Sequence, residues 1–453
     1  MRRKRRQRLP KDPIVLEIEK LSHEGRGIAH LDGKVVFVED ALPGEQVSAI
    51  YTQRRDAFDQ ARTQTVLRSS PHRIEPPCEY ATICGGCSLQ HFEVQAQLSF
   101  KAEVLHELLQ HALDSAQYEH LAPLEGPHFA YRRKARLAVR YVHKKEQVLI
   151  GFREKNSSFI TNMSNCEILD ERISRLLPAL QELIRGLQAY QHIPQIEVAL
   201  GDEYENTASL GLVFRHLTPL TKADESLLSV FAQEHQLALY LQGGGPETVR
   251  LHYPPQGEER LYYELPEYDL KLAFHPLDFT QINAAINHKM VHKALELLAL
   301  NKEDSVLDLF CGLGNFTLPA ATLAGQVLGI EGSEEMVQRG RENALRMGLE
   351  NVEFMSADLA SQQEKRPWAK RNFSKILLDP PRSGAIEIIA ELAALRPQRI
   401  VYVSCNPATL ARDAACLQEH GYRLAAAGVM DMFPQTTHVE SIALFLPKGR
   451  SVQ

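Results

Sequence analysis

The sequence predicts an α/β protein in three parts: a small β-barrel, a mixed α+β domain and a C-terminal parallel sheet with helices on both faces. Glycine-separated β-type runs fill residues 13–68, mixed patterns follow to about 265, and regular strand–helix alternation begins at about 266. Strands that alternate with helices are typical of a parallel sheet. We therefore expect a basic tail at 1–11, a barrel at 12–70, a central domain at 71–265 and an α/β domain at 266–453.

The first part combines a basic arm with short strands. Residues 1–11 carry seven Arg or Lys and no acid, and residues 131–155 carry nine Arg or Lys and two acids, although the whole chain has a net charge of −6. Phosphate contacts need such local patches rather than a global excess, so an oligonucleotide-binding barrel is the natural interpretation. Charge alone fits equally well a solvated tail and an ordinary charged sheet face, and the strand pattern alone fits any small β-module. The strands expected in the barrel are 14–18, 33–38 and 46–51.

The overall composition fits a globular protein of several domains. The chain has 453 residues, 44% of them hydrophobic, and no stretch approaches the roughly 20 apolar residues that cross a bilayer. The basic amino terminus has no apolar stretch after it, which is unlike a secretory signal. We expect a cytoplasmic protein with no membrane partner, in which the seven cysteines are metal ligands or catalysts rather than disulfides.

The central domain mixes helical and β-type patterns. Leucines recur on one face of residues 92–118, which predicts a helix, and a second helix is expected near 167–188. Strands are expected at 135–141, 148–152, 196–200 and 238–241.

The C-terminal domain shows regular alternation. Helices are expected in the gaps between strands, except that the last two strands have no helix between them and predict an antiparallel hairpin. The expected strands are 306–310, 327–331, 352–355, 376–379, 400–404, 422–430 and 440–446.

A glycine loop follows the first strand of this domain. Gly312 and Gly314 allow a tight turn and close approach to a ligand, and Glu331, nineteen residues after Gly312, can accept hydrogen bonds from ribose hydroxyls. A dinucleotide site would prefer a third glycine where Thr317 stands. With Asp308 in front, the loop instead resembles the first motif of S-adenosylmethionine (SAM)-dependent methyltransferases.

Two further positions complete the predicted cofactor pocket. Asp358, after the third strand, is expected near the adenine ring. Gln281, just before the sheet begins, is expected at the methionine end of the cofactor.

The ends of the fourth, fifth and last strands carry the reactive residues. Side chains at the carboxyl ends of parallel strands face the ligand crevice, so Cys405 and Asp379 are expected to meet there. Methylating carbon 5 of uracil requires a thiolate to add to carbon 6, an acid to position the ring and a base to remove the carbon-5 proton. These roles fit Cys405, Asp379 and Glu440, with His438 as a weaker base. We expect the helix that begins at Pro407 to lower the pKa of Cys405.

A second group of cysteines precedes the central domain's strands. Cys78, Cys84 and Cys87 form C-x5-C-G-G-C, and Cys166 follows after a long gap. Structural zinc usually uses two close pairs of ligands, so the spacing favours an iron–sulfur cluster but leaves zinc open.

The motifs together resemble those of the RNA (uracil-C5)-methyltransferase family. They are F-x-Q at 279–281, D-P-P-R at 379–382, S-C-N-P at 404–407 and H-V-E at 438–440. The resemblance implies that Cys405 attacks, that Glu440 deprotonates and that a [4Fe-4S] cluster is held by the cysteines at 78, 84, 87 and 166. It also implies cofactor or substrate contacts for six residues. These are Gln281, Phe310, Asn315, Glu331, Asp358 and Asp379.

The resemblance extends over nearly the whole chain. Residues 13–68 resemble the TRAM barrel, and barrel, cysteine element and catalytic domain together match the branch that modifies 23S ribosomal RNA, of the uracil-1939 type. This implies a monomer that grips a flipped uridine from a single-stranded loop. Two alternatives stay open: the same chemistry on transfer RNA or another 23S site, and a non-catalytic iron–sulfur RNA-binding protein.

Overall fold

The computed structural model describes residues 9–114, 116–205, 207–359, 361, 366 and 368–449. The described chain forms two compact units, residues 1–104 with 435–437 and residues 105–434 with 438–453. Most of the predicted basic tail, residues 1–8, lies outside the described residues.

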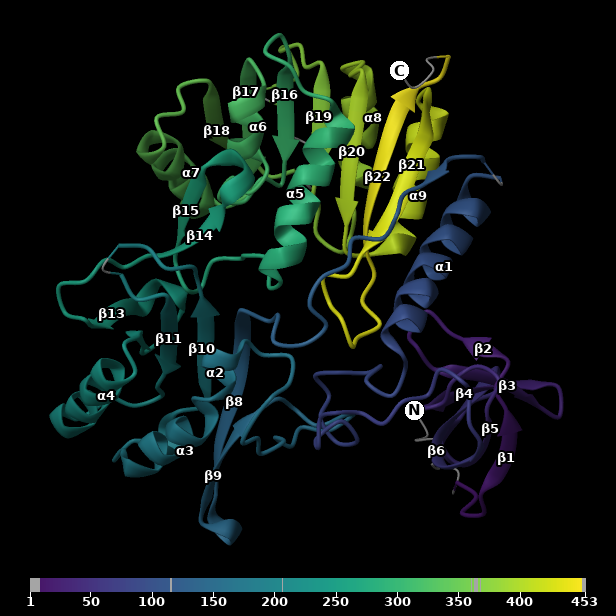
Figure 1. Cartoon of the computed structure of the whole chain (residues 1–453), viewed down its shortest axis with the longest axis vertical. Helices are drawn as coiled ribbons and strands as arrows, with labels where there is room; N and C mark the ends of the chain where they lie inside the picture. The colour runs from purple at the N-terminus through teal and green to yellow at the C-terminus, as the bar shows by residue number, and fades with distance from the viewer. Residues whose placement is uncertain are drawn as a thin grey trace, which may run out of the picture. The chain divides into compact units, whose positions relative to one another are not determined.

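The first unit contains a six-stranded sheet that curls on itself (Figure 1). Alternate residues of its strands, such as Leu16, Val36 and Val47, are buried in a common core, as the strand periodicity predicts. In spatial order the strands are β1 (Ile14–Glu17), β5 (Gln46–Arg54), β6 (Phe58–Arg68), β4 (Lys34–Glu39), β3 (Gly27–Leu31) and β2 (Lys20–Leu21).

Helix α1 (Val94–Ala112) leads from the first unit into the second. The second unit then forms a six-stranded central sheet, whose strands pair antiparallel except for β11 with β12. In spatial order the strands are β13 (Val249–Tyr253), β12 (Ala238–Gln242), β11 (Leu210–Arg215), β10 (Gln195–Leu200), β8 (Lys134–Val142) and β9 (Gln147–Gly151).

Three helices accompany the central sheet. They are α2 (Glu171–Ser174), α3 (Leu177–Gly186) and α4 (Lys222–Glu234), of which α3 packs on β9 and α4 on β12 and β13. The single helix expected near 167–188 is therefore two. Pro178 stands in the first turn of α3, where its missing N–H does no harm, so it begins a new helix rather than continuing the old one.

The catalytic sheet of the second unit has eight strands (Figure 1). Its first five strands in spatial order run parallel to one another. The last two long strands in the chain form the predicted antiparallel hairpin. In spatial order the strands are β18 (Val352–Ser356), β17 (Gln326–Glu331), β16 (Ser305–Leu309), β19 (Lys375–Leu378), β20 (Arg399–Ser404), β22 (Glu440–Pro447), β21 (Tyr422–Met430) and β7 (Glu119–His120). A separate hairpin, β14 (Leu261–Leu265) and β15 (Leu270–Phe274), precedes this sheet.

The order of strands explains where a ligand can bind. The chain leaves β16 toward β17 and β18 and then returns to place β19 on the other side of β16. Connections diverge at this point, so a crevice opens beyond the carboxyl ends of β16 and β19. All seven predicted strands of this domain are present within one or two residues.

Helices cover both faces of the catalytic sheet. α5 packs on β19, β20 and β22, while α9 packs on β20, β21 and β22. Between β18 and β19 the structure describes residues 357–359, 361, 366 and 368–374, and these contain no helix where one is predicted. No helix in the described part of the chain is long and apolar enough to span a bilayer. The helices are α5 (Ala284–Leu298), α6 (Thr317–Leu323), α7 (Glu334–Arg346), α8 (Ile386–Ala394) and α9 (Pro407–Glu419).

Candidate active site

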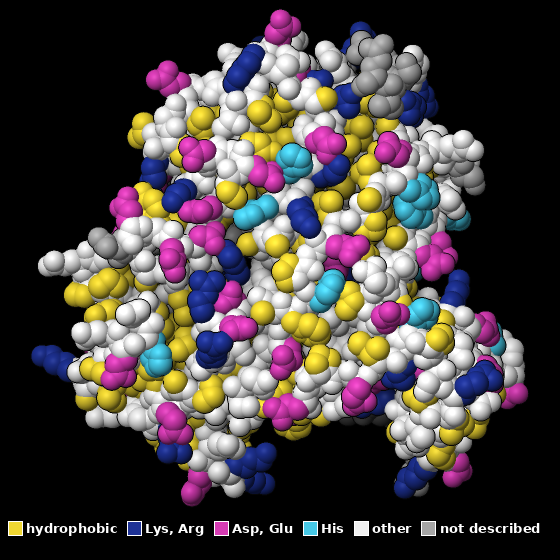
Figure 2. Space-filling model, in the orientation of Figure 1, with side chains coloured by type: hydrophobic (Ala, Val, Ile, Leu, Met, Phe, Trp, Pro, Cys, Tyr) yellow, Lys and Arg dark blue, Asp and Glu magenta, His cyan; other side chains and the backbone are white. Residues whose placement is uncertain are grey.

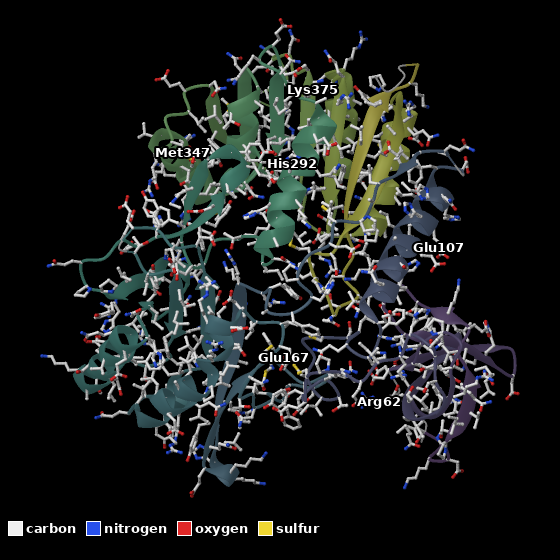
Figure 3. All side chains as sticks on the ribbon, in the orientation of Figure 1. Arg62, Glu107, Glu167, His292, Met347 and Lys375 are labelled. Atoms are coloured by element: carbon white, nitrogen blue, oxygen red, sulfur yellow. The ribbon has the colours of Figure 1, made fainter. Side chains whose placement is uncertain are left out.

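A cavity of about 1070 Å³ lies at the carboxyl ends of the catalytic strands. Lys375, labelled in Figure 3, marks the amino-terminal end of β19, whereas Asp379 at the other end lines the cavity. Seven of the eight residues predicted for catalysis or cofactor binding line this one cavity. They are Gln281, Phe310, Asn315, Glu331, Asp379, Cys405 and Glu440, and His438 lines it too.

The loop after β16 forms the floor of one end of the cavity. Phe310 has a backbone φ of 62°, which residues other than glycine rarely adopt. Gly312 and Gly314 have φ of 56° and 101°. A Cβ on Gly314 would come within 2.9 Å of Leu318 Cγ, so both space and conformation require glycine there. The loop therefore keeps its backbone exposed to a ligand.

Glu331 braces this loop from the end of β17. Its Oε2 accepts a hydrogen bond from Gly312 N at 3.1 Å, and its Oε1 accepts one from Ser333 N at 3.0 Å. Each carboxylate oxygen retains a further lone pair, so the side chain can still accept from a ligand's hydroxyls. The glycine floor and this acceptor fit the ribose of a nucleoside cofactor such as SAM.

Asn315 lies in the same loop and is held by side chains from two other elements. Its Oδ1 accepts from Tyr263 Oη and from Asn287 Nδ2, both at 3.0 Å, and its Nδ2 donates to Asn287 Oδ1 at 2.9 Å. Asn287 is buried on α5, and Tyr263 lies on β14. The two amides thus form a reciprocal pair beside the cavity.

Asp308 lies beneath the loop, sealed from solvent. Thr317 Oγ1 donates to its Oδ2 at 2.5 Å, and its Oδ1 has no hydrogen-bond partner among the described residues. Burial, and then the negative charges of Asp379 and Glu331, raise the pKa of Asp308 to about 8. The carboxyl group is therefore neutral at physiological pH, which removes the cost of burying a charge.

Cys405 stands at the other end of the cavity, directly after β20. The next residue, Asn406, caps α9 by accepting from Ala408 N at 3.2 Å, and Pro407 opens the helix. The Asn406 side chain also donates to the carbonyl of Arg382 at 3.0 Å. This bond joins the loop that carries Cys405 to the loop that follows Asp379.

The electrostatics of Cys405 differ from the expectation. Burial, followed by the charges of Glu440 and Asp379, raises the pKa of Cys405 to about 11, while Arg382 lowers it. The prediction that the amino terminus of α9 would lower this pKa is wrong for the described residues, because desolvation and two carboxylates outweigh the helix and Arg382. Burial likewise raises the pKa of Asp379 to about 7.

Glu440 reaches the same end from the neighbouring strand. It is buried at the start of β22, where Ser441 pairs with Ser404 in the antiparallel register. The next opposed positions along this pair of strands are therefore Glu440 and Cys405.

Asp358 and the four cysteines are not part of this arrangement. Asp358 is exposed after β18 and does not line the cavity. Cys78, Cys84 and Cys87 belong to the first unit and Cys166 to the second. Four thiols are chemically suited to iron, but the described residues contain no group of three or more His, Cys, Asp or Glu placed to hold a metal ion.

Several lining residues escaped sequence reasoning. Arg382 is the last residue of the D-P-P-R motif, in which only the acid was given a role, and Tyr263 lies in a hairpin with no motif at all. Residues at 246–260 also line the cavity, although they lie before the expected start of the catalytic domain. The D-P-P-R motif could have identified Arg382, but no sequence signal identifies Tyr263.

Comparison with known proteins identifies the family. Residues 93–448 match the family described as tRNA (Uracil-5-)-methyltransferase, and residues 14–55 match the TRAM domain. The chain belongs to this methyltransferase family.

Relatives in the family match end to end. A protein of Alkalilimnicola ehrlichii named 23S rRNA (uracil(1939)-C(5))-methyltransferase RlmD is 54% identical, covering 98% of each chain. A protein of Hahella chejuensis with the same name is 50% identical, covering 98% of this chain and 99% of its own.

A solved structure has the same fold. It is the tRNA (uracil-54, C5)-methyltransferase of Pyrococcus abyssi in complex with S-adenosyl-L-homocysteine, with a TM-score of 0.73 and 24% identity over 96% of this chain and all of that chain. The chain thus combines a SAM-dependent methyltransferase fold with an amino-terminal TRAM domain.

Proposed function

We propose that this protein methylates carbon 5 of a uracil in 23S ribosomal RNA, with SAM as the methyl donor. The observation that carries the proposal is the single cavity that Cys405, Asp379 and Glu440 share with Gln281, Asn315 and Glu331. The names of the relatives support 23S RNA, and position 1939 in particular, as the target.

The proposed reaction begins at Cys405. Cys405 attacks as its thiolate: the thiol proton leaves to solvent, the sulfur bonds to carbon 6 of the uracil, the electrons of the 5,6 double bond move toward O4, and carbon 5 becomes nucleophilic. SAM, when bound, would supply the electrophilic methyl group that carbon 5 takes up, and S-adenosylhomocysteine would be left behind. Glu440 then removes the proton from carbon 5, the double bond re-forms, and the carbon–sulfur bond breaks to release the Cys405 thiolate.

The remaining residues hold the reactants. Asp379 hydrogen-bonds the pyrimidine edge, and Glu331 accepts from the ribose hydroxyls of the cofactor. Gln281, Phe310 and Asn315 enclose the cofactor from the other side. Asp358 stays a prediction for the adenine end, because its exposed position on the loop after β18 leaves it outside the cavity.

We propose that RNA reaches this cavity along one face of the central sheet. α3 and α4 pack on one face, and on the other face register and alternation align Arg136, Arg140 and Arg215. All three side chains are exposed, and only Arg136 has an ion-pair partner among the described residues, Glu197. The register also puts Tyr240 on this face, but its ring is buried and cannot stack on a base, so the face suits phosphates rather than bases.

Charge distribution makes this face distinctive. Over the face of the molecule shown in Figure 2, Lys and Arg side chains are interspersed with Asp and Glu. On the face of the central sheet, by contrast, three arginines stand beside one acid, Glu197, which suits the phosphates of single-stranded RNA. Flipping the target uridine out of that strand costs a few kcal/mol.

A salt titration tests the RNA face. The double variant Arg140→Ala, Arg215→Ala should weaken 23S RNA binding roughly tenfold. The slope of the logarithm of the binding constant against the logarithm of salt concentration should become shallower by about 0.7 per lost phosphate contact. Arg185→Ala is the matched control, since Arg185 is an exposed arginine on α3, at the opposite face. Equal effects of the two changes on binding would remove this face from the proposal.

We also propose that Cys78, Cys84, Cys87 and Cys166 ligate a [4Fe-4S] cluster. The support is the C-x5-C-G-G-C spacing with a distant fourth cysteine. Anaerobically purified protein should be brown, with an absorbance band at about 400 nm and about four irons per chain. Colourless protein with stoichiometric zinc would overturn the cluster but leave the methylation proposal intact.

Methyl transfer to defined RNAs tests the function itself. Labelled SAM should methylate protein-free 23S fragments and leave unmodified tRNA unlabelled, and nuclease digestion should release 5-methyluridine. Labelling of tRNA alone would favour the transfer-RNA alternative. Tight RNA binding without any transfer would favour the non-catalytic one.

A further inference from the structure

We infer that Tyr263 and Asn287 are positioning residues that orient the amide of Asn315 so that one N–H points at the carboxylate of the cofactor. This inference rests on the proposed function, because it takes SAM as the occupant of the cavity. It deepens that function by assigning two residues, distant in sequence, to recognition of one end of the cofactor.

The first step is a count of hydrogen-bonding capacity. Asn315 Oδ1 accepts from both Tyr263 Oη and Asn287 Nδ2, so both of its lone pairs are occupied. Asn315 Nδ2 donates one hydrogen to Asn287 Oδ1 and keeps a second. Asn315 lines the cavity, so the only hydrogen-bonding capacity that its side chain can still offer a ligand is this remaining donor.

The second step is that the arrangement cannot reverse easily. Burial raises the pKa of Tyr263, so its hydroxyl keeps its proton and continues to donate. Asn287 is 4% exposed and lies on α5, so its amide cannot exchange its partner for water. An Asn315 amide turned the other way would lose the Tyr263 bond and leave the half-buried Tyr263 hydroxyl without this acceptor.

The third step identifies the acceptor. Glu331, itself an acceptor, is suited to the ribose hydroxyls, which are donors. The strongest acceptor left on SAM is the carboxylate of its methionine end, and a hydrogen bond to a carboxylate is about twice as strong as one between neutral groups. The Asn315 donor therefore selects for the amino-acid end of the cofactor.

Binding of two ligands to the purified full-length chain, measured by calorimetry, tests the inference. The ligands are S-adenosylhomocysteine and 5′-methylthioadenosine, which lacks the carboxylate. Tyr263→Phe and Asn287→Ala should each weaken S-adenosylhomocysteine binding by about five- to thirtyfold and change 5′-methylthioadenosine binding less than twofold. At saturating SAM, kcat should stay within about threefold while KM for SAM rises.

Two further variants make the test specific. Tyr268→Phe removes the hydroxyl of another tyrosine packed on the same core and should leave both ligands unaffected. In an Asn315→Ala background, Tyr263→Phe should have no further effect, since it acts through Asn315. Equal weakening of both ligands, or additive effects in the double variant, would overturn the inference. Failure of the unaltered chain to bind S-adenosylhomocysteine would instead overturn the proposed function.

Discussion

The two ends of the cavity are built in opposite ways. At the cofactor end, Glu331 and Asn315 are bound by neighbouring backbone and side-chain groups before any ligand arrives. At the reacting end, the Asp379 carboxylate makes no hydrogen bond to a described residue, and burial, followed by the charges of Glu440 and Asp379, raises the pKa of Cys405 to about 11. The cofactor end is preorganised. At the reacting end the surroundings disfavour the Cys405 thiolate, and we expect bound substrate to change those surroundings.

This contrast predicts which kinetic constant each end controls. Changes at the cofactor end should raise KM for SAM, because they remove binding that ground and transition states share. Changes at the reacting end should lower kcat. The following variants sharpen or break the contrast, beginning with the largest expected effect.

Cys405→Ala should lower methyl transfer by more than about a thousandfold, because no other group can form the bond to carbon 6. RNA affinity and S-adenosylhomocysteine affinity should remain within a few-fold of the unaltered chain. The check is labelled-methyl transfer together with RNA binding by filter retention. Near-normal turnover would contradict the covalent mechanism.

Glu440→Gln should slow turnover by about a hundredfold or more, because the carbon-5 proton then lacks its base. Carbon 5 is methylated before this step, so a covalent RNA–protein species should accumulate and migrate slowly on a denaturing gel. His438→Ala is the control for the weaker candidate base and should not accumulate the species. Absence of the adduct in Glu440→Gln would move the base role to another residue.

The pH dependence of Cys405 alkylation tests the electrostatics without RNA. Only the thiolate reacts, so the iodoacetamide rate should rise about tenfold per pH unit up to the pKa of about 11. The charges of Glu440 and Asp379 raise this pKa, so Glu440→Gln and Asp379→Asn should each move the rise to lower pH. Peptide mass spectrometry reports modification at Cys405 alone. An unchanged profile in both variants would mean that the carboxylates do not set the thiol's ionisation.

Asp308→Asn should have the smallest effect and concerns stability. The pKa of Asp308 is raised to about 8, so the folded chain holds a proton that the unfolded chain releases near pH 4. Stability from this group therefore falls as pH rises from about 4 to about 8 and then levels off. In the variant, the free energy of unfolding should fall less over this pH range, by a difference of at most a few kcal/mol. The check is urea unfolding followed by fluorescence of Trp368, the one tryptophan, which is buried. An equal fall in the variant would contradict the protonated state.

Much of this site could be predicted from the sequence, because the residues that follow apolar strands can be recognised there. Asp379 and Cys405 each end an apolar run, and parallel strands carry such ends to one edge. The supporting residues could not be predicted in this way. Tyr263 on the β14–β15 hairpin meets Asn315 only in the folded chain, where His288 of α5 also bonds the hairpin's backbone at Glu264. The raised pKa of Cys405 comes from burial and from two carboxylates that are distant in sequence. The break between α2 and α3 was predictable in principle, since it occurs at Pro178.

The pairing of Ser404 with Ser441 has a consequence for variation in this chain. Two neighbouring strands lie about 4.8 Å apart whatever side chains they carry, so backbone hydrogen bonds set the separation of Cys405 and Glu440, which adjoin this pair. Length changes in surface turns should leave that gap intact. A single residue inserted within β20 or β22 would move one of these two side chains to the opposite face, and would also displace the buried side chains along that strand.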